Sequence, residues 1–260
     1  MRRLPDFLET LAKDARQTIR EGYYNIEGSY ARTDIGLKES ILRCKKNPVI
    51  AEIKVASPSA GRIVHNIDPE ATASIMQRGG AAGLSILTEP RHFMGKVGYF
   101  IAAGKSSLPR LMKDIVLDPI QIKAATKMGA EGILLIESLF RKGLANVTLE
   151  EMIDLAHSNG IEVLLETHTR EEFENALQTE ADLVGINNRN HSNLRTDIQV
   201  TKKILDACDP KDRIIVSESG INTRNDIRFL KECGARAFLA GSSIMKSKNP
   251  EEKLRELVEA

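Results

Sequence analysis

Residues 128–136 read Met-Gly-Ala-Glu-Gly-Ile-Leu-Leu-Ile, and they contain the unit from which most of the chain is built. Gly129 follows a helical pattern, and the apolar run Gly132–Ile136 comes directly after it. Glycine often ends a helix because it adopts the left-handed conformation at little steric cost. A short apolar run without strict polar alternation is typical of a strand buried on both faces of a parallel sheet. This stretch therefore predicts a helix end followed by a buried strand.

The same unit recurs along the chain. Successive apolar runs lie roughly 20–33 residues apart, which is the length of one strand plus a crossover helix. Asp68-Pro69, Asp118-Pro119 and Asn249-Pro250 each supply an N-cap followed by proline at the first helical position. The predicted strands are Val49–Ile53, Gly83–Leu87, Leu108–Val116, Gly132–Ile136, Ile161–Leu165, Leu183–Ile186, Arg213–Val216 and Ala237–Ala240.

This pattern favours one α/β fold over its main competitor. Eight strands with seven intervening helices and a last helix at Glu251–Val258 fit a single closed (βα)₈ TIM barrel. The competitor is a doubly wound open sheet, which usually has about six strands and, for nucleotides, a glycine fingerprint. The sequence contains neither G-x-G-x-x-G nor G-x-x-x-x-G-K-[ST].

We expect residues 1–260 to form one domain, with the barrel over 48–260 and an N-terminal helical extension over 1–47. The segment Glu21–Asp34 is polar and contains glycine, so it is predicted to be a connector. The apolar face of an amphipathic helix is predicted from the spacing of Leu8, Leu11, Ala12, Ala15 and Ile19.

The charge balance argues against nucleic-acid and membrane-surface binders. The 260 residues include 37 Lys and Arg and 36 Asp and Glu, which gives a formal net charge of +1. Binders of nucleic acid or anionic membranes normally show a basic excess. No run approaches the ~18 apolar residues of a membrane span. The N-terminus MRRLPDFLET becomes acidic before any apolar core forms, so we expect no secretory signal and a cytoplasmic location.

Cysteine and histidine usage indicates neither disulfides nor a metal site. The three cysteines, Cys44, Cys208 and Cys233, are widely spaced and form no C-x-x-C. The five histidines have no metal-ligand spacing and are interpreted as scattered residues: His65, His92, His157, His168 and His191. We expect no cofactor and no metal, and a monomer rather than an oligomer.

Charged residues stand at the ends of four predicted strands. Glu52 and Lys54 lie at the end of the first run, Lys113 in the third, Glu166 after the fifth and Glu218 after the seventh. A buried ion is costly unless it is paired or functional. Since active sites of barrels lie at the carboxyl ends of the strands, these residues predict an acid/base constellation. The alternative is an ion-pair network that only plugs the barrel.

Polar loops follow the last three strands. Ser219-Gly220 and Gly241-Ser242 predict a phosphate site, because barrel enzymes commonly bind phosphate in the loops after strands seven and eight. Simple turns are the alternative interpretation. The segment Gly185–Asn190 adds Asn187 and Arg189, which could bind hydroxyl groups or merely form a turn.

The sequence resembles a known family, the indole-3-glycerol phosphate synthases. The block Ile50–Ser59, with its E-x-K-x-x-S-P-S pattern, looks like the signature of that family. Further blocks follow in the family's order over residues ~48–245: Leu111–Asp114, Gln121-Ile122, Leu165-Glu166, Gly185–Arg189, Ser217–Ile221 and Gly241–Ser243. Lys96 departs from the small polar residue that family members often carry after Phe93-x-Gly95.

The resemblance implies a cofactor-free reaction on an anionic substrate. That reaction converts 1-(2-carboxyphenylamino)-1-deoxyribulose 5-phosphate to indole-3-glycerol phosphate, carbon dioxide and water. By analogy, Lys113 is the acid at the ketone oxygen and Glu166 is the acid/base at the departing hydroxyl. Lys54 is the carboxylate partner or a second acid, and Glu52 is an orienting group or base.

Substrate contacts are also implied by the resemblance. The predicted substrate-binding residues are Asn187, Arg189, Glu218, Ser57 and Phe93, and the predicted phosphate-binding residues are Ser219, Gly220, Gly241 and Ser242. Leu135 and Leu139 join Phe93 as candidates for an apolar slot that holds the aromatic ring.

The residues alone leave two other functions open. One is a different phosphosugar barrel, such as an isomerase or an aldolase. The other is a barrel that binds a phosphorylated metabolite without turnover, although binding alone does not require paired acids and bases at four strand ends.

Overall fold

The computed structural model describes residues 7–190 and 194–260. The sequence-based interpretations of residues 1–6 and of His191 lie outside these ranges.

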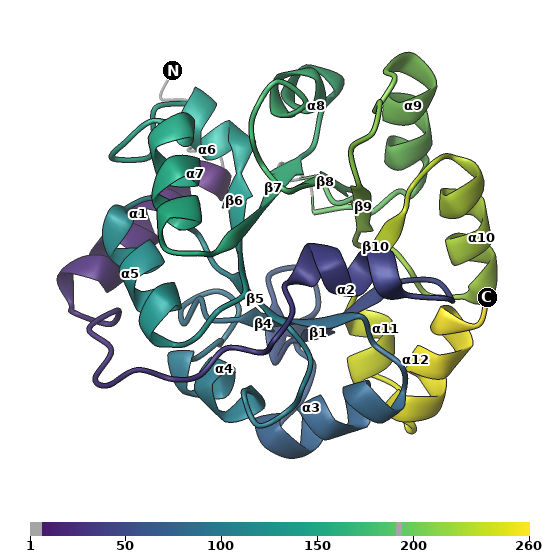
Figure 1. The fold of residues 1–260 in the computed structure, drawn as a ribbon, viewed down its shortest axis with the longest axis horizontal. Coiled ribbons are helices and arrows are strands. Elements are labelled where there is room, and N and C mark those ends of the chain that lie inside the picture. Colours follow the sequence, from purple (N-terminus) through teal and green to yellow (C-terminus); the bar gives the residue numbers. More distant parts are fainter. Residues whose placement is uncertain (1–6, 191–193) are drawn as a thin grey trace.

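Within the described ranges, eight parallel strands close into a barrel in the order β1-β10-β9-β8-β7-β6-β5-β4. Figure 1 looks into this ring of strands, with the helices arranged around it. The predicted α/β TIM barrel is confirmed. The strands are β1 (Val49–Ile53), β4 (Gly83–Leu87), β5 (Arg110–Lys113), β6 (Gly132–Ile136), β7 (Glu162–Thr167), β8 (Leu183–Asn187), β9 (Ile215–Glu218) and β10 (Ala237–Ala240).

The third predicted strand was too long. Leu108–Val116 was expected, but β5 ends at Lys113. The next residue, Asp114, accepts a hydrogen bond from the backbone N–H of Ile115 at 2.7 Å. That N–H is therefore satisfied locally, and the chain leaves the sheet directly after Lys113.

The helices surround the barrel, and three of them begin at the caps that the sequence predicted. Asp68, Asp118 and Asn249 each cap a helix by accepting a backbone N–H. Gly129 has a φ of 74°, the left-handed conformation expected at that helix end. The helices are α3 (Pro69–Arg78), α4 (Val97–Ala103), α5 (Pro119–Lys127), α6 (Glu137–Arg141), α7 (Leu149–Ser158), α8 (Arg170–Ala176), α9 (Gln199–Ala207), α10 (Arg224–Glu232), α11 (Ser242–Met245) and α12 (Pro250–Val258).

The N-terminal extension contains one predicted and one unpredicted helix. The amphipathic helix α1 (Phe7–Arg20) is confirmed, and it buries Leu8 and Leu11. Glu21–Asp34 contains no helix or strand, as expected for a connector. The sequence analysis missed α2 (Leu37–Arg43), because seven residues show too little periodicity.

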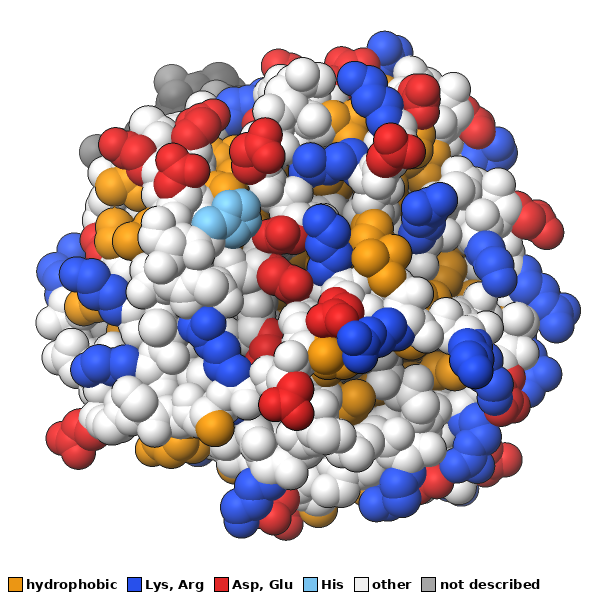
Figure 2. Space-filling model, in the orientation of Figure 1, with side chains coloured by type: hydrophobic (Ala, Val, Ile, Leu, Met, Phe, Trp, Pro, Cys, Tyr) orange, Lys and Arg blue, Asp and Glu red, His pale blue; other side chains and the backbone are white. Residues whose placement is uncertain are grey.

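The helix α2 covers the amino-terminal end of the barrel. Ser40 Oγ donates to the carbonyl of Ala82, and the backbone N–H of Lys38 donates to the Glu162 carboxylate at 2.9 Å. Glu162 is the first residue of β7, and Ala82 directly precedes β4. Figure 1 shows α2 lying across the near end of the ring, and Figure 2 shows that charges of both signs are interspersed on this face.

The interior of the barrel changes from apolar to charged along three of its strands, β5, β7 and β9. Side chains two apart in a strand point to the same face. The interior residues Leu111, Leu164 and Val216 belong to one buried apolar cluster, which also includes Leu8 and Leu11 of α1. Two residues further along the same three strands stand Lys113, Glu166 and Glu218.

A short antiparallel pair, β2 (Ala56–Ser57) and β3 (Gly61–Arg62), follows β1.

Among residues 7–190 and 194–260, no helix has both the length and the apolar character that a membrane crossing requires.

Candidate active site

A cavity opens at the carboxyl ends of the strands, here called the active-site cavity. Its empty space is about 810 Å³, including its opening to solvent. Ten of the thirteen predicted site residues, all thirteen of which lie in the described ranges, line it: Glu52, Lys54, Ser57, Phe93, Lys113, Glu166, Asn187, Arg189, Glu218 and Ser219.

Lys113 lies between two buried carboxylates. Its Nζ donates to Oε2 of Glu166 and to Oε2 of Glu218, each at 2.9 Å. Burial lowers the pKa of Lys113, but the negative charges of Glu166, Glu218 and Glu52 outweigh this effect and raise the pKa above its usual value. Lys113 is therefore an ammonium at neutral pH.

Glu218 has the properties of a group that exchanges protons near neutral pH. Its side chain is only 1% exposed. Burial raises its pKa, Lys113 lowers it, and the neighbouring carboxylate of Glu166 raises it, so that the pKa reaches about 7. Glu218 was predicted both as a member of the acid/base constellation and, from the resemblance, as a substrate-binding residue, and its position and pKa suit acid/base work.

Glu52 and Lys54, at the end of β1, form a second ion pair beside the same cavity. Lys54 Nζ donates directly to Oε1 of Glu52, and both side chains are largely buried. The five charged residues predicted from four strand ends thus form one triad, Lys113 with Glu166 and Glu218, and one pair, Lys54 with Glu52, around one cavity. The network is paired and borders open space, and its acid/base role stays a prediction.

Two glycines make room for these carboxylates. A Cβ at Gly185 would lie 2.2 Å from Oε1 of Glu218, and a Cβ at Gly241 would lie 2.6 Å from Oε1 of Glu52. Real Cβ atoms do not approach so closely, so any larger residue would displace the acid. The sequence analysis did not find this role of Gly185.

The two predicted phosphate loops lie next to each other. β9 pairs with β10 so that Glu218 faces Leu239, and Ser243 Oγ donates to the carbonyl of Ile221 at 2.7 Å. Ser219 and Gly220 are both left-handed, with φ of 67° and 81°.

Only one of the four predicted phosphate ligands, Ser219, lines the active-site cavity, whereas Gly220, Gly241 and Ser242 are absent from its wall. Phosphate binding by these four residues stays a prediction.

Arg189 connects the loops after β8 and β1. Its guanidinium donates to Ser59 Oγ and to the carbonyl of Leu194, the latter at 3.0 Å. Asn187 accepts the backbone N–H of Arg189 at 3.0 Å, so part of the polar capacity of Asn187 serves the turn itself. Both the turn and the substrate-contact interpretations of this segment therefore remain compatible with the geometry.

Phe93 is positioned by a carboxylate that the sequence analysis missed. Glu89 accepts the backbone N–H groups of Arg91, His92 and Phe93 at 2.7 to 2.9 Å. It thereby shapes the loop between β4 and α4. The position of Glu89, a carboxylate just after the predicted strand Gly83–Leu87, is a sequence signal that could have indicated this role. Beyond this loop, the Lys96 ammonium lies 5.4 Å from the centre of the Tyr99 ring.

Helix α1 holds the same loop from outside. Asp14 of α1 contacts His92 Nε2 at 2.9 Å. Glu21, directly after α1, accepts two hydrogen bonds of 2.7 Å from the guanidinium of Arg91. Phe7 and Leu11 of α1 line the active-site cavity. The N-terminal helix is therefore part of the site as well as of the fold.

The apolar wall differs from the one expected. Leu135 and Leu139 were candidates, but neither lines the cavity, whereas Leu134 and Ile136 do. Leu135 packs with the cluster between the barrel and its helices, because alternate residues of β6 face opposite sides. The rest of the apolar wall comes from Phe7, Leu11, Pro58, Leu87, Phe93, Ile115, Leu194 and Leu239.

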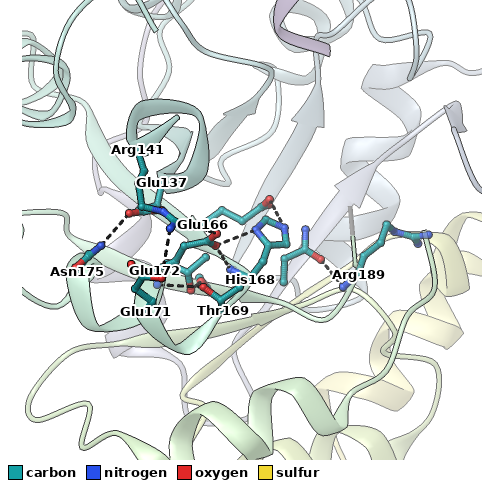
Figure 3. Close-up of polar contacts among 12 residues, drawn as sticks. Glu137, Arg141, Glu166, His168, Thr169, Glu171, Glu172, Asn175 and Arg189 are labelled. Carbon is teal, nitrogen blue, oxygen red and sulfur yellow. Dashed lines mark hydrogen bonds and ion pairs between the residues drawn. The ribbon is translucent and has the colours of Figure 1, made fainter. Parts of the chain in front are cut away.

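His168, which was predicted to have no role in a site, contacts Glu166 without lining the active-site cavity. His168 Nε2 is 3.2 Å from Oε1 of Glu166, and the contacts continue through Glu172 to Arg141 (Figure 3). The sequence gave no periodic signal for this contact. No group of three or more His, Cys, Asp or Glu side chains in the described part of the chain is arranged to hold a metal ion.

Comparison with known proteins identifies the family. The family model described as indole-3-glycerol phosphate synthase matches residues 8–257. Proteins of that name from Carboxydothermus hydrogenoformans and Methanocaldococcus jannaschii are each 38% identical to this chain. The alignments cover 97% of this chain and 99% of the first relative, and 95% and 91% for the second.

Solved structures of other proteins share the fold alone. A thiamine phosphate pyrophosphorylase from Pyrococcus furiosus superposes with a TM-score of 0.58 at 15% identity, covering 83% of this chain and 95% of that one. Because the family model spans nearly all of the chain and the relatives align over almost their whole length, the chain belongs to the indole-3-glycerol phosphate synthase family.

Proposed function

We propose that this chain closes the indole ring of indole-3-glycerol phosphate, with loss of carbon dioxide and water from the carboxyphenylamino sugar phosphate. The observation that supports it best is Lys113, an ammonium held between two buried carboxylates on the wall of a largely apolar cavity. Proton donors and acceptors beside an aromatic-sized apolar wall suit a reaction that adds and removes protons around an aromatic ring.

Ring closure requires a proton donor at the ketone oxygen. An aromatic carbon attacks the ketone, and the developing alkoxide must be protonated. Lys113 suits this role because its raised pKa keeps it protonated before the step. When substrate intervenes, Lys113 exchanges its contacts with Glu166 and Glu218 for contacts with the substrate, and its proton becomes easier to give.

Loss of water requires a second donor and a base. We assign Glu166 as the acid/base at the departing hydroxyl, since it lies next to Lys113 and on the same cavity wall. Glu166 is ionised before the step, takes up the proton of the ring N–H, and gives that proton to the hydroxyl, which leaves as water. Glu218, with a pKa of about 7, can accept or return a proton nearby. Lys54 and Glu52 provide the carboxylate partner and an orienting group or base beside the same cavity.

The charges also suit an anionic substrate. Lys54 and Lys113 are the cations that can meet the carboxylate of the anthranilate ring. The aromatic ring would lie against Phe93 and the apolar wall. The phosphate would bind at Ser219-Gly220 and Gly241-Ser242, where backbone N–H groups and a helix start favour an anion.

The proposal is tested by incubating the chain with the carboxyphenylamino sugar phosphate and following indole fluorescence. We expect an indole product, no cofactor requirement, and no adduct after treatment with borohydride. An aldolase would form a borohydride-trapped Schiff base. A non-catalytic barrel would be stabilised by the ligand, by ~2.7 kcal/mol at a hundredfold excess over Kd, without turnover. Either result would overturn the proposed reaction.

We also propose a cytoplasmic monomer whose only required partner is this small anion. In the described part of the chain Cys44, Cys208 and Cys233 are all free, as is usual for proteins of a reducing compartment. Light scattering coupled to gel filtration tests the oligomeric state, and a mass of twice 28.8 kDa would contradict the monomer.

A further inference from the structure

The carboxylate of Glu166 has different neighbours at its two oxygens. Oε2 accepts from Lys113 at 2.9 Å, on the side of the active-site cavity. Oε1 lies 3.2 Å from Nε2 of His168. His168 does not line the active-site cavity, and its side chain is only 9% exposed. Substrate in the cavity would therefore meet Glu166 and not the imidazole behind it.

The other edge of the imidazole faces a second carboxylate. Nδ1 of His168 lies 3.6 Å from Oε2 of Glu172, and the same oxygen accepts the backbone N–H of His168 at 2.6 Å. Glu172 is held in turn by Arg141 of α6, at 3.0 Å. Figure 3 shows this series of contacts from Glu166 to Arg141. The ring is thus oriented by two carboxylates, one from the end of β7 and one from α8.

The surrounding charges favour the protonated ring. Arg141 also faces Glu137 and Glu171, each at 3.4 Å, so its charge is shared among several acids. Burial lowers the pKa of His168, but Glu166 and Glu172 outweigh this effect and raise it to about 9.

A second cavity borders His168, and it shares Asn187 and Arg189 with the wall of the active-site cavity. Arg141, Lys142 and Arg189 are the other cations in its wall. They add positive charge near the ring, whereas Glu166 and Glu172 are acids that contact its two nitrogens at 3.2 Å and 3.6 Å. At neutral pH, Glu166 therefore lies between two cations, Lys113 and His168.

We propose that His168 is a positioning residue for Glu166: its imidazolium holds Oε1, so that Oε2 stays directed at Lys113 and the substrate and the carboxylate stays ionised. His168 acts through Glu166 without touching substrate. Its effect on turnover rests on the proposed function, whereas its contact with Glu166 does not.

The kinetic test compares His168→Gln with His157→Gln. His157 also contacts a carboxylate, Asp182 at 2.9 Å, but it lies outside the active-site cavity wall and makes a suitable control. Partners that orient a functional group are typically worth ~10–100-fold. We expect His168→Gln to lower kcat at least about tenfold with little change in KM, while His157→Gln leaves both unchanged.

The pH profile separates positioning from a merely structural role. Without the imidazolium, Glu166 loses a neighbouring cation and its pKa rises. We therefore expect the acidic limb of kcat to move to higher pH in His168→Gln, and by less in Glu172→Gln, which removes only the outer partner. Wild-type kcat and an unshifted limb in folded His168→Gln would overturn the proposal.

An NMR titration tests the contact without turnover. The His168 imidazole should stay protonated up to a pH of about 9 in the wild-type chain. In Glu166→Gln it should lose its proton at clearly lower pH, because one of its two carboxylates is gone. An identical His168 titration in both proteins would overturn the proposal even if the chain turns over substrate. A coupled titration with no turnover would instead contradict the proposed function.

Discussion

Replacing Lys113 with methionine removes the ammonium and keeps a side chain of similar length. In the structure this ammonium donates two hydrogen bonds of 2.9 Å to buried carboxylates and borders the active-site cavity. Loss of a general acid typically costs ~10²–10⁴-fold in rate, or about 3–5 kcal/mol of barrier. We expect kcat of Lys113→Met to fall at least ~10²-fold with little change in substrate affinity.

The same substitution has a pH-dependent effect on stability. Without the cation, Glu166 and Glu218 are left as neighbouring buried carboxyls, and their folded-state pKa values rise. A carboxyl whose pKa is raised on folding destabilises the native state as pH rises above its unfolded value of ~4.3. Breaking a buried ion pair costs ~3–5 kcal/mol, so urea unfolding should show a larger loss at pH 8 than at pH 5.

Lys105→Met is the matched control. Lys105 also pairs with a glutamate, Glu70 at 2.7 Å, but its side chain is 70% exposed. Surface substitutions usually change stability by no more than ~0.5 kcal/mol, and this residue is remote from the cavity wall. If Lys113→Met lost affinity while kcat stayed near normal, Lys113 would not be the acid.

Other substitutions test the remaining parts of the site and the fold. Ser219→Asp should raise KM by charge repulsion with the phosphate, and an unchanged KM would move the phosphate site elsewhere. Gly185→Ala should lower kcat, since its Cβ would lie 2.2 Å from Glu218; wild-type kinetics would show that Glu218 need not stay in place. Arg110→Ala breaks a buried pair with Glu131, and urea unfolding should show a loss of ~3–5 kcal/mol, whereas a loss under ~1 kcal/mol would contradict this reasoning. The folded pKa of His168 is raised to about 9. The protonated ring therefore stabilises the folded chain fully below pH ~6.5, and this stabilisation is lost as the pH rises to 9. The difference in unfolding free energy between the wild-type chain and His168→Gln should close over that range, and a difference independent of pH would argue against a charged His168.

The sequence predicted the barrel well because its strands are buried on both faces. Apolar runs such as Gly132–Ile136 differ sharply from the polar helices between them, and caps such as Asp118 mark where those helices begin. The same property explains the error at Leu135. When both faces of a strand are apolar, no alternation in the sequence shows which residues face the barrel interior.

The charged part of the site was predictable for a related reason. An ion within an apolar run, such as Glu52 or Glu218, is conspicuous because its burial is costly. The pairing of these ions was not predictable, because the register and closure of the barrel decide which strand ends meet. Neither was the role of His168 or Gly185, since each depends on one neighbour from a distant part of the sequence.

The short helix α2 and the loop held by Glu89 show a further limit. Seven residues of helix carry little periodicity, and tertiary contacts such as Ser40 with Ala82 stabilise them instead. The clamp between α1 and the loop after β4 likewise depends on side chains about 70 residues apart.

The central claim is that one cavity performs both the decarboxylation and the ring closure. It is tested most directly by supplying substrate labelled with ¹³C at the aromatic carboxyl group and measuring labelled carbon dioxide and indole product together. The account predicts equal amounts of both from the wild-type chain and at least a hundredfold slower release of both from Lys113→Met, on the general-acid magnitude of ~10²–10⁴. The absence of both labelled carbon dioxide and indole product after long incubation would contradict it. An indole product that retains the label would also contradict it.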